Sequence, residues 1–111
     1  METRKNREHL ANFFIAGLTY YEAPLCFKKL KIGTRLTLVW EKDNKYDARA
    51  VAIYYKDFKL GFVPRTENRI FYKLLKMGHS DLFELLIQQV DPHAYPEQQI
   101  RVVAHLIGEE G

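Results

Sequence analysis

The chain has 111 residues, 47% hydrophobic and 14% aromatic, which is enough for one domain with a hydrophobic core. Its net charge of +3 is compatible with a polyanionic partner but does not identify one. No apolar run reaches the roughly 20 residues that span a bilayer, and the single cysteine excludes an internal disulfide. We therefore expect a cytoplasmic protein that needs no cofactor.

The first third of the chain predicts a strand and a short helix. Residues 1–10 are mostly charged and predict a flexible start, so we expect a single domain over residues 11–108. The apolar run NFFIAGL, residues 12–18, predicts a buried strand. In PLCFKKLKIG, residues 24–33, a proline stands at the start and a glycine at the end, which predicts a short helix or helical turn.

The middle of the chain predicts three strands that lie next to one another. Apolar side chains alternate over residues 36–40 and again over residues 51–55, which is the periodicity of a strand. The segment KLGFV, residues 59–63, follows after a tight connection. Strands joined this closely are expected to be antiparallel.

One amphipathic helix and two further strands are predicted after Pro64. Thr66 is a suitable N-cap for a helix over residues 66–77, and Gly78 is a suitable C-terminal stop. The apolar face of this helix would carry Ile70, Phe71, Leu74 and Leu75. Residues 82–90 and 99–107 are expected to be strands. The whole pattern predicts a mainly β or α+β fold, a small six-stranded antiparallel barrel with two short helices.

Known signatures of enzymes are missing from the sequence. There is no G-x-S-x-G, H-E-x-x-H or Walker motif. Cys26 lies in an apolar stretch, and the four histidines lack the spacing of zinc ligands. A calcium loop starting at Asp43 would need glycine and glutamate where Ala48 and Tyr54 stand. We expect a protein that is not an enzyme and has no metal site.

Basic and aromatic residues together are typical of single-strand nucleic-acid binding. The predicted helix carries a cationic stripe within about 80 degrees of arc, formed by Arg65, Arg69, Lys73 and Lys76. Exposed aromatic rings can stack on unpaired bases while cations hold the phosphates. The tyrosines that could do so are Tyr20, Tyr21, Tyr46 and Tyr72. An ordinary solvated helix face remains the alternative interpretation.

The stretch EKDNKYDARAVAIYY, residues 41–55, places a polar loop directly before a strand. The loop contains Asn44, Tyr46 and Asp47, which is compatible with two interpretations. It could be a recognition loop, or it could be a hairpin turn in which Asp47 caps backbone N–H groups.

Three segments resemble the HIRAN domain family: FFIAGLTYYEA, TLVWEKDNKYDARAVAIYY and KLGFVP. The resemblance covers about residues 12–107, and DNKYDARAV is its most specific part. It implies a small six-stranded barrel with two helices. It also implies binding of single-stranded DNA at or near a free 3′ end, in DNA repair or at replication forks.

The resemblance assigns a role to five residues of this chain. Tyr20 and Tyr46 would flank the terminal nucleotides, with Asn44 in the same pocket. Asp47 would accept a hydrogen bond from the 3′-hydroxyl, and Arg65 would lie near the phosphates. Arg69 and Lys73 would extend the basic rim.

The chain departs from the family's DNA-binding pattern at two positions. Thr19 stands where that pattern has arginine, and Phe62 stands where it has histidine. Both changes remove contacts to DNA, so general single-strand binding without end specificity is an alternative. A second alternative is a protein-interaction module that docks a helicase or a nuclease.

Overall fold

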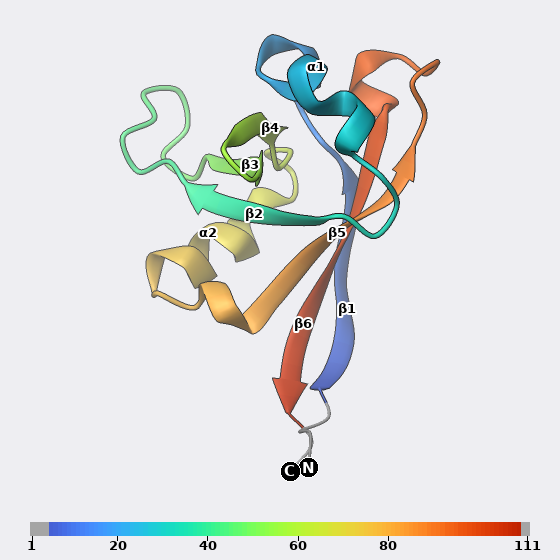
Figure 1. Ribbon diagram of the computed structural model, residues 1–111. Coiled ribbons are helices and arrows are strands. Elements are labelled where there is room, and N and C mark those ends of the chain that lie inside the picture. The colour runs from blue at the N-terminus through green and yellow to red at the C-terminus, as the bar shows by residue number, and fades with distance from the viewer. Residues whose placement is uncertain (1–4, 110–111) are drawn as a thin grey trace.

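The computed structural model describes residues 5–109, and within this range six strands form one antiparallel sheet (Figure 1). The order of the strands in the sheet is β1-β6-β5-β2-β3-β4. The strands are β1 (Lys5–Phe14), β2 (Arg35–Trp40), β3 (Val51–Tyr55), β4 (Phe58–Phe62), β5 (Phe83–Val90) and β6 (Ile100–Glu109). The α-helices are α1 (Ala23–Cys26) and α2 (Asn68–Lys76), and 3₁₀ turns include η1 (Leu18–Tyr20) and η2 (Phe27–Lys29). The predicted six antiparallel strands and two short helices are thereby confirmed.

Strands β1 and β6 lie side by side over their whole length, from Lys5 opposite Glu109 to Phe14 opposite Arg101 (Figure 1). Residues 5–10, which we expected to belong to a flexible start, form the first part of β1, while residues 1–4 lie outside the described range. Strand β1 begins earlier than predicted because backbone pairing with β6 does not require apolar side chains there. It also ends earlier, because the chain turns at Gly17, whose φ is +71°, into η1.

The closed barrel is not confirmed, because the two ends of the sheet do not pair along a continuous ladder. Within residues 5–109, the segment after β1 meets β4 at one isolated bridge, in which Ala16 and Phe62 exchange N–H···O bonds of 2.9 and 2.8 Å. Gly61 permits this approach, since a Cβ atom there would lie 2.3 Å from the carbonyl oxygen of Ala16. We call this contact between the ends of the sheet the seam.

Helix α2 packs on the core through Phe71, which is fully buried between Phe13 of β1 and Phe83 of β5. The three rings meet edge to face, with centroids 5.9 and 5.7 Å apart. Ile70, predicted on the apolar face, is instead 43% exposed. The predicted stop is confirmed, because Gly78 has a φ of +79° and its N–H donates to the carbonyl of Leu75.

Helix α2 begins two residues later than predicted, and Thr66 is not its N-cap. The chain first makes a turn in which the N–H of Glu67 donates to the carbonyl of Pro64, at 2.8 Å. Glu67 then occupies the N-cap position, without a side-chain hydrogen bond to the helix. Arg65 consequently lies in the turn before α2 and not on the helix.

The other predicted helix is a single α-helical turn, α1, followed by η2. Cys26 is buried at the end of α1. Burial is the main cause that raises the pKa of its thiol, and the nearby charge of Glu22 raises it further. Within the described residues, no helix has the length and apolar character needed to cross a membrane. No group of three or more potential ligand side chains there could hold a metal ion.

Candidate functional site

The loop between β2 and β3 is shaped by Asn44. Its side-chain oxygen accepts hydrogen bonds from the N–H groups of Tyr46 and Asp47, at 2.9 and 3.0 Å. Its side-chain nitrogen donates to Oε1 of Glu41, at 3.1 Å. This pattern is an Asx turn, in which a side chain stands in for a backbone group. Asn44 therefore fixes the direction in which Tyr46 and Asp47 leave the loop.

Asp47 connects this loop to the start of α2. Its Oδ1 accepts the N–H of Arg49 at 2.9 Å, which confirms that it caps the turn. Its Oδ2 accepts the side-chain amide of Asn68 at 3.0 Å and lies 3.7 Å from Nε of Arg65. The side chain keeps 19% of its surface exposed. Since a carboxylate has about four acceptor positions, Asp47 can still accept a hydrogen bond from a ligand.

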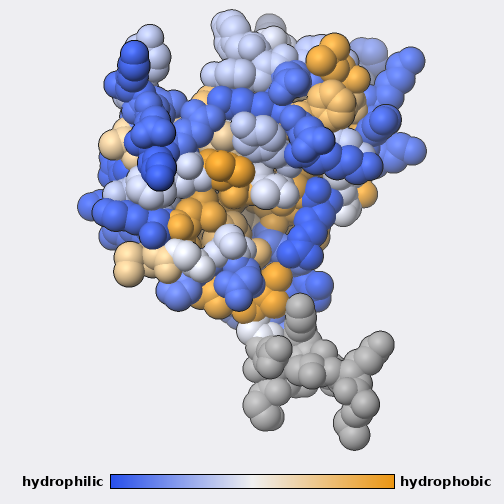
Figure 2. All heavy atoms as spheres, turned by 60° about the vertical axis from the view of Figure 1, so that its left-hand side comes forward, coloured by the Kyte–Doolittle hydropathy of each residue, from blue (hydrophilic) through white to orange (hydrophobic). Residues whose placement is uncertain are grey.

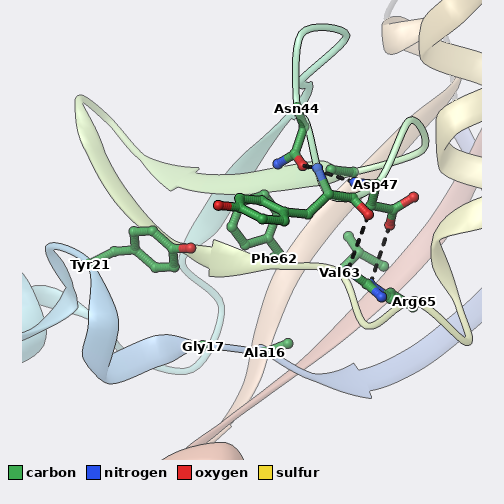
Figure 3. Close-up of a pocket in the computed structure, with 10 residues that line it drawn as sticks. Ala16, Gly17, Tyr21, Asn44, Asp47, Phe62, Val63 and Arg65 are labelled. Atoms are coloured by element: carbon green, nitrogen blue, oxygen red, sulfur yellow. Dashed lines mark hydrogen bonds and ion pairs between the residues drawn. The ribbon is translucent and has the colours of Figure 1, made fainter.

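A pocket of about 310 Å³ opens between this loop, η1 and the end of β4. Figure 3 shows Tyr21 at the left, Phe62 in the middle, and Asp47 and Arg65 at the right, with Ala16 and Gly17 below. The lining residues are Ala16, Gly17, Tyr21, Asn44, Tyr46, Asp47, Ala50, Phe62, Val63 and Arg65. The pocket thus combines aromatic rings, a carboxylate and a guanidinium around a small apolar floor.

The aromatic side of the pocket is held in place by Lys59. The rings of Tyr21 and Phe62 meet edge to face, with centroids 5.4 Å apart. The ammonium of Lys59 lies 4.6 Å from the centroid of Tyr21 and 4.4 Å from that of Phe62. It also pairs with Oε2 of Glu41 at 2.6 Å. This cation therefore joins both rings to the β2–β3 loop.

Four of the seven predicted site residues line the pocket: Asn44, Tyr46, Asp47 and Arg65. Tyr20 does not, since its ring is 85% exposed outside the pocket and the neighbouring Tyr21 takes the place expected for it. Alternation alone does not reveal which of two adjacent tyrosines faces inward when they lie at the end of a 3₁₀ turn. No pattern in the sequence marked Lys59 as a part of the site.

Arg69 and Lys73 are exposed on α2 and lie outside the pocket lining. Arg65 is held at the pocket, where Nη2 donates to the carbonyl oxygen of Tyr46 at 3.4 Å. The predicted stripe of four cations is therefore divided, with one cation at the pocket and three along the helix. Of the two positions that depart from the family pattern, Phe62 lines the pocket and Thr19 does not.

The fold is similar to that of a protein of known structure. A crystal structure of a protein from Lactobacillus plantarum superimposes with a TM-score of 0.78 over 96% of this chain and 100% of that chain, at 19% sequence identity. No curated protein matches the sequence. A family model, described as the HIRAN domain, matches residues 9–107, which include the β2–β3 loop, the pocket and the seam. The chain therefore belongs to the HIRAN domain family.

Proposed function

We propose that this domain binds single-stranded DNA at or near a free 3′ end, as a binding module without catalytic activity. The HIRAN domain family is generally linked to nucleic-acid binding. The observation that carries the proposal is the pocket, in which exposed aromatic side chains, Asp47 and Arg65 lie around one opening. The resemblance to the family further suggests a role in DNA repair or at replication forks.

The chemistry of the pocket suits the last nucleotides of a strand. Tyr46 is 88% exposed and offers its ring for stacking on an unpaired base. Asp47 accepts the hydrogen of a free 3′-hydroxyl, and its charge repels a 3′-phosphate. Arg65 is 73% exposed, so its guanidinium can turn toward a phosphate at little cost in ion-pair energy. Arg69 and Lys73 lie further along α2, where they supply positive charge to the preceding phosphates.

A protein-docking module is the second candidate function. Leu25 in α1 and Ile32 after η2 are 74% and 75% exposed, and apolar side chains at a surface favour protein contacts over phosphate contacts. A helicase or a nuclease that acts on the same DNA would be a suitable partner. This interaction would depend little on salt, whereas DNA binding weakens with salt in proportion to the number of phosphates contacted.

Fluorescence anisotropy with a labelled short strand tests the proposal. We expect a strand with a free 3′-hydroxyl to bind more tightly than the same strand with a 3′-phosphate, and a blunt duplex to bind weakly. Affinity should fall as salt is raised. Equal affinity for the two single strands would remove end recognition from the proposal, and no binding to any of them would overturn it.

Two tyrosine variants locate the interaction. Tyr46→Ala should weaken binding by about 1–3 kcal/mol if the ring stacks on a base. Tyr95→Ala is the matched control, because Tyr95 is 74% exposed but lies outside the pocket, between β5 and β6. Unchanged affinity of Tyr46→Ala would show that the strand does not use this pocket.

A further inference from the structure

Trp40 and Tyr72 form a second aromatic surface outside the pocket. Trp40 ends β2, and its ring meets that of Tyr72 on α2 edge to face, with centroids 5.4 Å apart and an angle of 74°. The indole N–H donates to the carbonyl of Ala48 at 3.0 Å, which fixes the ring against the β2–β3 loop. Both side chains are only half-buried, so part of this aromatic surface faces solvent.

A second hollow, of about 400 Å³, lies beside Trp40. It is lined by Trp40 and by the first residues of the loop, Glu41 to Asn44. Asn44 also lines the pocket described above, so this side chain borders both hollows. A chain that passed Asn44 on leaving the pocket would enter the hollow that Trp40 lines.

The surroundings of Tyr72 are positively charged. Lys76 donates to the hydroxyl of Tyr72 at 3.3 Å, and its ammonium lies 5.6 Å from the centre of that ring. Lys73 and Lys76 are exposed, and neither forms an ion pair within residues 5–109. Figure 2 shows the face that carries α2 and the loop, with apolar side chains at its centre and hydrophilic ones around them.

Two carboxylates also border the second hollow. Glu41 is already paired with Lys59 at 2.6 Å, so its charge is compensated within the protein. Asp43 is exposed. Three exposed lysines oppose the charge of Asp43: Lys42 on the same loop, and Lys73 and Lys76 on α2. Cations therefore outnumber uncompensated acids among these residues. The surface is therefore complementary to an anionic chain that carries flat, apolar groups.

We infer that Trp40 and Tyr72 form a second base-stacking subsite, so that the domain takes a single strand of several nucleotides. The inference rests on the proposed function and extends it beyond the terminal nucleotide. The end of the strand occupies the pocket, the strand passes Asn44, and a preceding base stacks on Trp40 while Lys73 and Lys76 hold its phosphates. Such an arrangement of an aromatic surface beside a basic track suits single strands of any sequence.

Trp40 provides the test, because it is the only tryptophan in the chain. Its fluorescence would be followed while an oligothymidylate of about ten nucleotides is added, and binding would be measured in parallel by anisotropy of a labelled strand. We expect quenching of Trp40 that follows the same binding curve as the anisotropy. Binding without any change in Trp40 fluorescence would overturn the second subsite and leave the proposed function standing. No binding by either method would overturn both.

A substitution separates stacking from an indirect change at Trp40. Trp40→Leu keeps an apolar side chain against Tyr72 but offers no aromatic face. We expect it to weaken binding of the long strand roughly 5- to 150-fold, the equivalent of one stacked base. Binding of a dinucleotide, which fills the pocket alone, should not change. Tyr95→Leu is the matched control, with no expected effect on either ligand.

The same variant also distinguishes base stacking by Trp40 from a structural role in shaping the loop. If Trp40→Leu lowers the affinities for the dinucleotide and the long strand by the same factor, the ring only shapes the loop, and the inference is wrong. Lys76→Gln gives a second measurement that does not alter the apolar packing. It should reduce the salt dependence of long-strand binding by about one phosphate contact, and an unchanged salt dependence would contradict the path along α2.

Discussion

Asp47 is predicted to contribute both to the stability of the domain and to ligand recognition. Asp47→Ala removes the acceptor for the amide of Asn68, which is 1% exposed and whose side-chain oxygen already has no partner in the described structure. Leaving a buried donor unsatisfied costs about 1–3 kcal/mol. The lost bond to the N–H of Arg49 adds about 1 kcal/mol, and the exposed Arg65 pair adds little. We therefore expect a total loss of roughly 2–4 kcal/mol.

Equilibrium unfolding in urea measures this loss directly. Asp43→Ala is the matched control, because Asp43 lies in the same loop but its carboxylate has no hydrogen bond or ion pair within residues 5–109. We expect the control to change stability by less than about 0.5 kcal/mol. Asp47→Asn keeps one acceptor oxygen and should fall between the two. A loss below about 0.5 kcal/mol for Asp47→Ala would refute the view that this side chain joins the loop to α2.

Three further changes test other parts of the structure. Gly61→Ala should destabilise the domain by about 1–3 kcal/mol in urea unfolding, because its Cβ would collide with the carbonyl of Ala16; an unchanged midpoint would count against the seam. Arg7→Ala should lower the free energy of unfolding by about 1–3 kcal/mol, because Nε of Arg7 lies 2.5 Å from Oε1 of the buried Glu84 and the substitution removes this partner. Unchanged stability would contradict that role. Cys26 should react with iodoacetamide only as fast as the domain unfolds, because the thiol is buried and burial raises its pKa, so that little thiolate forms near neutral pH. Rapid alkylation of the folded protein at pH 7 would refute this.

The sequence predicted the elements whose side chains alternate between the core and solvent. Leu36 and Leu38 of β2 are buried while Arg35 and Thr37 are exposed, which is the pattern that marked the strand. The first half of β1 could not be found in this way. The side chains of residues 6–9 are exposed on both faces, and backbone pairing with β6 holds this part of the strand in place.

The candidate site was predictable to the extent that it is local in sequence. Asn44, Tyr46 and Asp47 lie within four residues, so their proximity follows from the loop itself. The parts that depend on long-range packing could not be read from the sequence. Lys59 reaches the aromatic rings and the loop from β4, and Asn68 meets Asp47 from α2, across separations that only the fold determines.

Because the pocket lies on the seam, the binding of a ligand in the pocket is linked to the contact between the two ends of the sheet. Ala16 and Phe62 both line the pocket, and they also form the one bridge that joins the two ends of the sheet in the described structure. A ligand held between them adds contacts to both ends, and by mass action it disfavours every opening that separates them. The amide hydrogens of these two residues would then exchange with solvent more slowly as the pocket fills. The backbone itself would report binding, whatever the ligand is.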